Sequence, residues 1–277
     1  MTSIRVLGPG DVASALELVD RHPVVDVFAG ARVHASKLAP GRLGGELWGF
    51  YERGELMSAC YVGANLVPVQ ATQAAARTFA DRAIRRGRRC SSIVGPAEAV
   101  LAMWEVLRPE WGPARDVRAS QPVMALARPP AVAPDPWVRR VHPEEVDVLH
   151  PAAVAMFTEE VGISPNGSDG GAYYRARLVE LIRAGRAFAR FEDGDVVFKA
   201  EIGAVTPHAC QVQGVWVRPD RRGRGLAARG MAAVAAHALR DIAPAVSLYA
   251  NDYNHAALGT YRRVGFTEVA RFATIMF

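Results

Sequence analysis

Residues 215–227 are VWVRPDRRGRGLA, an apolar run that ends at a proline and is followed by arginine and glycine. The apolar run predicts a strand. The alanine-rich stretch from Leu226 to Leu239 predicts a helix that ends before Pro244. The chain therefore passes from a strand into a helix through a flexible, positively charged turn.

A glycine-rich turn between a strand and a helix is a potential anion site. The first backbone amides of a helix have no acceptor within the helix, and the helix dipole places partial positive charge beside them. Gly223 and Gly225 permit positive φ angles and a close approach of phosphate. Arg222 and Arg224 add donors, and Ala227 keeps the helix entry narrow. The spacing fits neither a P-loop nor a Rossmann fingerprint. A solvated, arginine-decorated helix start is the alternative.

Strands and helices alternate on both sides of this turn. The sequence predicts strands at 137–141, 209–217, 246–250 and 268–277, helices at 143–157, 173–184 and 255–263, and a hairpin at 186–205 with its turn at 192–195. Such an order predicts a mixed α/β or α+β sheet domain of about 140 residues.

The first half repeats this order of elements more weakly. It offers a strand and helix at 4–22, a hairpin around Arg53 and Gly54, and a helix at 71–87 that no glycine-containing turn precedes. Prolines at 129, 130, 134 and 136 predict a linker at 129–136 between a domain at 1–128 and a domain at 137–277. If the halves are duplicates, the first has lost the chemistry of the turn.

The composition is that of a soluble globular protein. Half of the 277 residues are apolar and 22% are charged. No apolar run approaches the roughly 20 residues of a bilayer span, and the first residues lack a secretion signal, so we expect a cytoplasmic protein with no membrane partner. Cys60, Cys90 and Cys210 are odd in number and widely spaced, which predicts neither disulfides nor a zinc site.

The charge favours a small anionic ligand. The net charge is +5 and the pI is near 9.4, but the basic residues are spread along the chain and nearly all are arginine. The densest patch, IRRGRRC around Arg85, Arg86, Arg88 and Arg89, is expected to be the solvated end of a helix, because no aromatic residues are interleaved with it. We therefore expect no nucleic-acid partner. The arginine and alanine bias suits a bacterium with a GC-rich genome.

The segment from Arg222 to Ala227 resembles the Q/R-x-x-G-x-G/A motif of the GNAT superfamily of acyl-CoA-dependent N-acyltransferases, and it follows a strand as that motif does. A second match is LYANDYNHAALGTYRRVGF at 248–266, which contains Asn254 and Tyr261. The resemblance covers about residues 136 to 277. A tandem chain with one intact half is similar to two-lobed members such as the mycothiol synthases. The resemblance implies two lobes, each a mixed, mostly antiparallel sheet flanked by helices, with a degenerate N-terminal lobe.

The resemblance implies that acetyl-CoA, or another short acyl-CoA, is the co-substrate and that no metal takes part. The pantetheine arm would lie where the strands at 210–217 and 246–250 separate. An unpaired amide near Val215 would polarise the thioester carbonyl. The implied cofactor-binding residues are Val215, Trp216, Val217, Arg222, Gly223, Arg224, Gly225, Leu226, Ala227, Asn254 and Tyr261.

The implied reaction is direct attack by a primary amine on the thioester. Tyr261 occupies the position where many members keep a tyrosine beside the cofactor sulfur, and its phenol is a candidate general acid. The alternative is an aromatic ring that only packs.

The general base and the acceptor side are less defined. Lys199 and Glu201 share a strand face, and Glu201 is the candidate base, directly or through water; an ion pair with Lys199 or an outward-facing pair is the alternative. Glu159, Glu160 and Gln213 are candidates for substrate binding, although adjacent carboxylates near a helix end are often only solvated.

The sequence thus predicts an N-acetyltransferase whose acceptor is a small-molecule or protein amine. Its histidines have no metal-ligand spacing. A non-catalytic acyl-CoA-binding sensor or interaction module is the alternative. A sensor needs the turn from Arg222 to Ala227 to bind the cofactor, but it needs no general acid.

Overall fold

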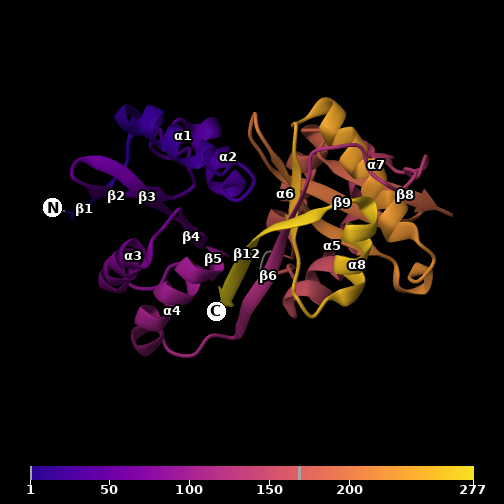
Figure 1. The fold of residues 1–277 in the computed structure, drawn as a ribbon. Coiled ribbons are helices and arrows are strands. Elements are labelled where there is room, and N and C mark those ends of the chain that lie inside the picture. The colour runs from indigo at the N-terminus through magenta and orange to yellow at the C-terminus, as the bar shows by residue number, and fades with distance from the viewer. Residues whose placement is uncertain (1, 168–169) are drawn as a thin grey trace. The chain divides into compact units, whose positions relative to one another are not determined.

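The structure is a computed structural model that describes residues 2–167 and 170–277 (Figure 1). It divides into two compact units. One comprises Met1–Met124, Tyr249–Asn254 and Glu268–Phe277, and the other comprises Ala125–Leu248 and His255–Thr267. The chain therefore crosses from one unit to the other at 124/125, 248/249, 254/255 and 267/268.

The first unit contains one mixed sheet with four α-helices. Its strands lie in the order β1-β2-β3-β4-β5-β12-β6. From β1 to β4 neighbours are antiparallel, β4 and β5 are parallel, and β5 pairs antiparallel with β12. The elements are β1 (Thr2–Val6), α1 (Val12–Asp20), α2 (Val27–Ser36), β2 (Glu46–Glu52), β3 (Glu55–Val62), β4 (Asn65–Val69), α3 (Gln73–Arg86), β5 (Ser92–Pro96), α4 (Ala97–Trp111), β6 (Asp116–Leu126) and β12 (Thr267–Met276).

The second unit repeats this plan. Its strands lie in the order β7-β8-β9-β10-β11, antiparallel from β7 to β10 and parallel between β10 and β11. The elements are β7 (Arg139–Arg140), α5 (Val146–Val161), α6 (Ala172–Arg183), β8 (Ala187–Glu192), β9 (Asp195–Val205), β10 (Cys210–Val217), α7 (Leu226–Asp241), β11 (Val246–Tyr249) and α8 (His255–Val264). The predicted fold class, two units with mostly antiparallel sheets and flanking helices, is confirmed.

Local sequence signals explain several element boundaries. Asp193 and Gly194 have φ angles of 52° and 83°, the pair of positive values that a two-residue hairpin turn between β8 and β9 requires. Helix α8 ends at Gly265, whose φ of 111° is unfavourable for other residues. Helix α5 continues to Val161, beyond the predicted end at residue 157, although Pro151 lies inside it.

Helices cover both faces of the second sheet. Ala187 and Ala189 of β8 lie opposite Glu201 and Lys199 of β9, and both alanines belong to an apolar cluster with residues of α5 and α6. The other face of β9 meets α7, where Gly230 lies so close to Phe198 that a Cβ would be 2.7 Å from its ring. Lys199 and Glu201 therefore face α5 and α6.

The proline-rich segment 129–136 has no helix or strand, but it is held against the second unit. The N–H of Asp135 donates to the carbonyl of Arg229 at 3.0 Å, and its buried carboxylate accepts from Arg190 at 2.7 Å. The assignment of 129–136 as a linker between domains 1–128 and 137–277 stays a prediction. Among the described residues, no helix is long and apolar enough to span a membrane.

Candidate active site

The arginine-glycine turn joins β10 to α7. After Val217 the chain makes a short 3-10 turn at Pro219–Arg221, and α7 begins at Leu226 as predicted. Gly223 and Gly225 have φ angles of 76° and 78°, and a Cβ on either would meet nothing within 4 Å. Glycine is therefore required by the backbone conformation, and the space outside the turn is open.

The start of α7 differs from the start of its counterpart α3. In α3 the side chain of Thr72 caps the helix, accepting a hydrogen bond from the N–H of Ala75 at 3.2 Å. The residue at the same position before α7 is Gly225, which has no side chain to offer. The first amides of α7 are therefore left for an acceptor outside the helix.

The two arginines of the turn have different surroundings. Arg222 donates from Nη2 to Glu159 Oε2 at 2.7 Å and from Nε to the carbonyl of Val217 at 3.0 Å. Arg224 is exposed and has no ion-pair partner within residues 2–167 and 170–277. Arg224 is thus the free guanidinium beside the turn, whereas Arg222 holds the turn in place.

Glu159 connects α5 to this turn. Its other oxygen, Oε1, accepts a hydrogen bond from the indole Nε1 of Trp216 at 3.0 Å. Burial acts to raise the pKa of Glu159, but the hydrogen bonds from Trp216 and Arg222 outweigh it and leave the pKa below its ordinary value. Glu159 is therefore an ionised anchor for Trp216 and Arg222.

A β-bulge interrupts the pairing of β9 and β10. The register moves from Gln213, opposite Glu201, to Trp216, opposite Lys199, so Gly214 and Val215 lie outside the ladder. Gly214 has a φ of 61°. An isolated glycine within QVQGVWV is the sequence signal for such a bulge, and our sequence analysis did not use it.

A buried ion pair lies beneath the bulge. Nζ of Lys199 lies 2.7 Å from Oε1 of Glu201 and donates to the carbonyl of Gly214 at 3.0 Å. Both side chains are almost fully buried. In a trans peptide the carbonyl and the N–H point in opposite directions, so a Gly214 carbonyl turned toward Lys199 turns the N–H of Val215 away from it. The ion pair with Lys199, one of the alternatives for Glu201, is present.

Strands β10 and β11 separate beyond a short paired stretch. Their parallel pairing covers Cys210 with Val246 and Gln211 with Ser247 and goes no further along β10. The backbone of β10 from Val212 onward is therefore not used by this ladder, and the pantetheine groove between these strands stays a prediction.

Tyr261 lies on α8 and is buried against Phe266, with ring centroids 6.2 Å apart. Burial raises the pKa of its phenol well above the ordinary value, and the charge of Glu160 adds to this. The phenol therefore stays protonated at neutral pH and is a proton donor. The structure thus places Tyr261 and Glu160 within electrostatic reach of each other.

The other predicted residues are placed as follows. Gln213 lies opposite Glu201 in the ladder, and its side chain covers Gly203. Asn254 directly precedes α8 and belongs to the Tyr249–Asn254 stretch of the first unit, where its N–H donates to the carbonyl of Asn251 at 3.0 Å. Within the described residues, no group of three or more His, Cys, Asp or Glu side chains is arranged to hold a metal ion.

Each half of the chain matches a protein-family model. Residues 153–266 match the family model described as the acetyltransferase (GNAT) family, and residues 45–149 match a domain of unknown function, DUF4081. No curated protein matches the chain.

Solved structures match the fold over nearly the whole chain. A GNAT-family acetyltransferase from Colwellia psychrerythraea is 13% identical over 99% of both chains, with a TM-score of 0.54. A tandem GNAT protein of the clavulanic acid biosynthesis pathway is 15% identical over 100% of this chain and 98% of its own, with a TM-score of 0.58. A GCN5-related N-acetyltransferase from Sphaerobacter thermophilus is 19% identical over 99% of this chain and 94% of its own, with a TM-score of 0.59. At these identities the matches show the fold alone.

Proposed function

Since residues 153–266 form an acetyltransferase domain of the GNAT family, we propose that the protein transfers the acetyl group of acetyl-CoA to a primary amine. The observation that carries the proposal is the contrast between the helix starts in the two units. Helix α7 begins after Gly225, with no side-chain cap and Arg224 free beside it, whereas Thr72 caps α3. An anion such as the pyrophosphate of acyl-CoA would satisfy the uncapped amides.

In this proposal the six residues from Arg222 to Ala227 hold the pyrophosphate, and the β10 backbone at Val215–Val217 holds the pantetheine arm. Arg224 supplies a mobile guanidinium. Glu159 is already bonded to Trp216 and Arg222, so we propose that it supports the turn. Glu160 and Gln213 would line the acceptor side.

The bulge at Gly214 supports a role for Val215 in catalysis. When the amine attacks the thioester carbon, the carbonyl oxygen gains negative charge, and the N–H of Val215 would donate to it. The hydrogen bond from the Lys199 ammonium to the Gly214 carbonyl acts on the same peptide group. Because a cation at the carbonyl polarises the amide, Lys199 would strengthen Val215 as a donor.

Proton transfer would then involve two side chains. The amine nitrogen forms its bond to carbon and gives up a proton to Glu201, directly or through water. The carbon–sulfur bond breaks with its electron pair on sulfur, and Tyr261 donates a proton to the departing thiolate. Tyr261 is then reprotonated from solvent.

The test of this function is release of free CoA thiol from acetyl-CoA by the full-length protein. The panel of acceptors should contain a polyamine, an aminoglycoside, amino acid amides and a lysine-containing peptide. We expect turnover with at least one class. Tight binding of acetyl-CoA without turnover for any acceptor would instead support the sensor, and a lack of acetyl-CoA binding would exclude both.

Glu201→Gln separates the two roles open to this carboxylate. If Glu201 is the base, kcat should fall by about 10², near the lower end for general base catalysis. Glutamine keeps the shape and can still accept from Lys199, so acetyl-CoA affinity should stay within a few-fold of wild type. Lower thermal stability with unchanged kcat would show that Glu201 serves only as the partner of Lys199.

A further inference from the structure

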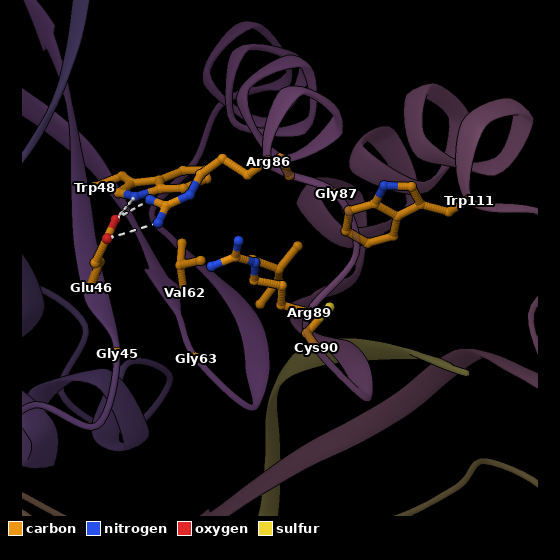
Figure 2. A pocket seen from close by; sticks show the side chains of 12 residues that line it. Gly45, Glu46, Trp48, Val62, Gly63, Arg86, Gly87, Arg89, Cys90 and Trp111 are labelled. Atoms are coloured by element: carbon orange, nitrogen blue, oxygen red, sulfur yellow. Dashed lines mark hydrogen bonds and ion pairs between the residues drawn. The ribbon is translucent and has the colours of Figure 1, made fainter.

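The first unit contains a cavity of about 310 Å³ that shares no residue with the proposed active site (Figure 2). It lies between the start of β2, the end of β3 and the C-terminal ends of α3 and α4. Val62, Leu66, Ala83 and Trp111 give it an apolar lining, and Glu46, Arg86 and Arg89 place charges at it. The cavity therefore combines an apolar interior with a mostly cationic rim.

The carboxylate that lines the cavity, Glu46, is already paired with an arginine. Glu46 Oε1 accepts from Arg86 Nη2 at 2.9 Å, and Oε2 accepts both from Arg86 Nη1 and from the indole Nε1 of Trp48, the latter at 2.7 Å. The hydrogen bond from Arg86 is the main cause that lowers the pKa of Glu46. Glu46 is thus an ionised carboxylate whose charge is neutralised by Arg86.

Two of the four arginines in the IRRGRRC segment, residues 84–90, have defined partners. Arg86 binds Glu46 and also lies 5.6 Å from the Trp48 ring centroid, while Arg88 lies 4.7 Å from the Phe277 ring centroid. The expectation that this segment is only a solvated helix end is therefore too simple for these two residues.

Arg89 is different. Its guanidinium reaches across the mouth of the cavity toward Val62 (Figure 2). Among the described residues it has no carboxylate, carbonyl or aromatic ring as a partner. On another wall, the indole Nε1 of Trp111 is buried and has no acceptor in the described part of the chain. Arg89 is therefore an unpaired cationic donor at the cavity, whereas Glu46 is already paired with Arg86.

We propose that this cavity binds a small organic oxyanion, a carboxylate or phosphate monoester carried on a flat apolar body. The oxyanion would accept the forked donors of Arg89, and the body would lie against Val62, Leu66 and Trp111. At about 30 Å³ per water-sized group, the volume admits a ligand of on the order of ten non-hydrogen atoms.

The test is calorimetric titration of the full-length protein with four probes. Benzoate and phenyl phosphate carry the two oxyanions on one body, benzamide is the neutral analogue, and inorganic phosphate lacks the body. We expect at least one of the first two to bind at millimolar concentration or below. Benzamide and inorganic phosphate should each bind about tenfold or more weakly, equivalent to about 1.4 kcal/mol.

Two variants and one control complete the experiment. Arg89→Met keeps an unbranched apolar stem, removes the guanidinium, and should weaken the better oxyanion about tenfold or more. Ala83→Leu should weaken it by filling the cavity. Arg85→Met removes a nearby exposed charge that does not line the cavity and should change affinity less than twofold. The midpoint of thermal unfolding should be unchanged in all three, which confirms that each is folded.

Three results would overturn the proposal. These are a lack of binding by both benzoate and phenyl phosphate, equal affinity for benzamide, or unchanged affinity in a folded Arg89→Met variant. A preference between benzoate and phenyl phosphate identifies the oxyanion without affecting the proposal.

Discussion

Tyr261→Phe is expected to lower kcat by about 10² to 10⁴, the usual range for general acid assistance, while acetyl-CoA affinity stays within a few-fold of wild type. In the proposed reaction, the leaving sulfur would gain negative charge as the tetrahedral intermediate collapses, and a phenol within reach would protonate it. Burial and the charge of Glu160 keep the Tyr261 phenol protonated, so the wild-type protein has a proton to give there. Phenylalanine preserves the ring and its contact with Phe266 and deletes only the hydroxyl.

Steady-state kinetics with a saturating amine, together with calorimetry for acetyl-CoA, measures both quantities. Phe266→Leu is a useful control, because it disturbs the ring contact and keeps the hydroxyl. An unchanged kcat in Tyr261→Phe would mean that the thiolate leaves unaided or takes its proton from water. Loss of affinity together with kcat would indicate a folding defect and argue against a specific role as acid.

Gly225→Glu should nearly abolish acetyl-CoA binding. The substitution places a carboxylate at the uncapped start of α7, where it would repel the pyrophosphate and compete for the same amides. Losing two or more charge-assisted hydrogen bonds corresponds to a drop in affinity of at least about 10². Calorimetry on the wild type should also give one acetyl-CoA per chain, because Thr72 already caps the corresponding helix α3.

Gly194→Glu is the matched control. Gly194 also has a positive φ, 83°, and open space where a Cβ would be, but it lies in the β8–β9 hairpin turn. Gly194→Glu therefore introduces the same backbone strain and the same negative charge as Gly225→Glu, but it lies outside the arginine-glycine turn. If both variants bind acetyl-CoA as the wild type does, the assignment of the turn is wrong. Two equal sites per chain would instead contradict a degenerate first unit.

The sequence predicted most of what local patterns encode. The start of α7 at Leu226 and the turns at Arg53–Gly54 and Asp193–Gly194 follow from glycine, charge and alternation over a few residues. The contact of Glu159 with Arg222 could not be predicted in this way, since it joins α5 to a turn 63 residues later.

Two further features depend on geometry that periodicity does not reveal. Alternation predicted that Lys199 and Glu201 share a face, and the structure adds that Lys199 reaches the carbonyl of Gly214. Alternation could not predict the contact between Lys199 and Gly214, because the bulge shifts the register of β10. Likewise, residues 268–277 were correctly expected to form a strand. Their pairing with β5, which is far away in the chain, depends on tertiary contacts that local alternation does not encode.

The pairing of β12 with β5 determines when the sheet of the first unit can be completed during translation. β12 lies between β5 and β6 in the sheet of the first unit, yet it is synthesised after every other strand. While a domain made early in translation can often fold as it emerges, this sheet stays open until residues 267–276 have left the exit tunnel. During that interval β5 and β6 present unpaired edges, which are templates for aggregation. We therefore expect nascent chains to expose these two strand edges while their second half is being synthesised.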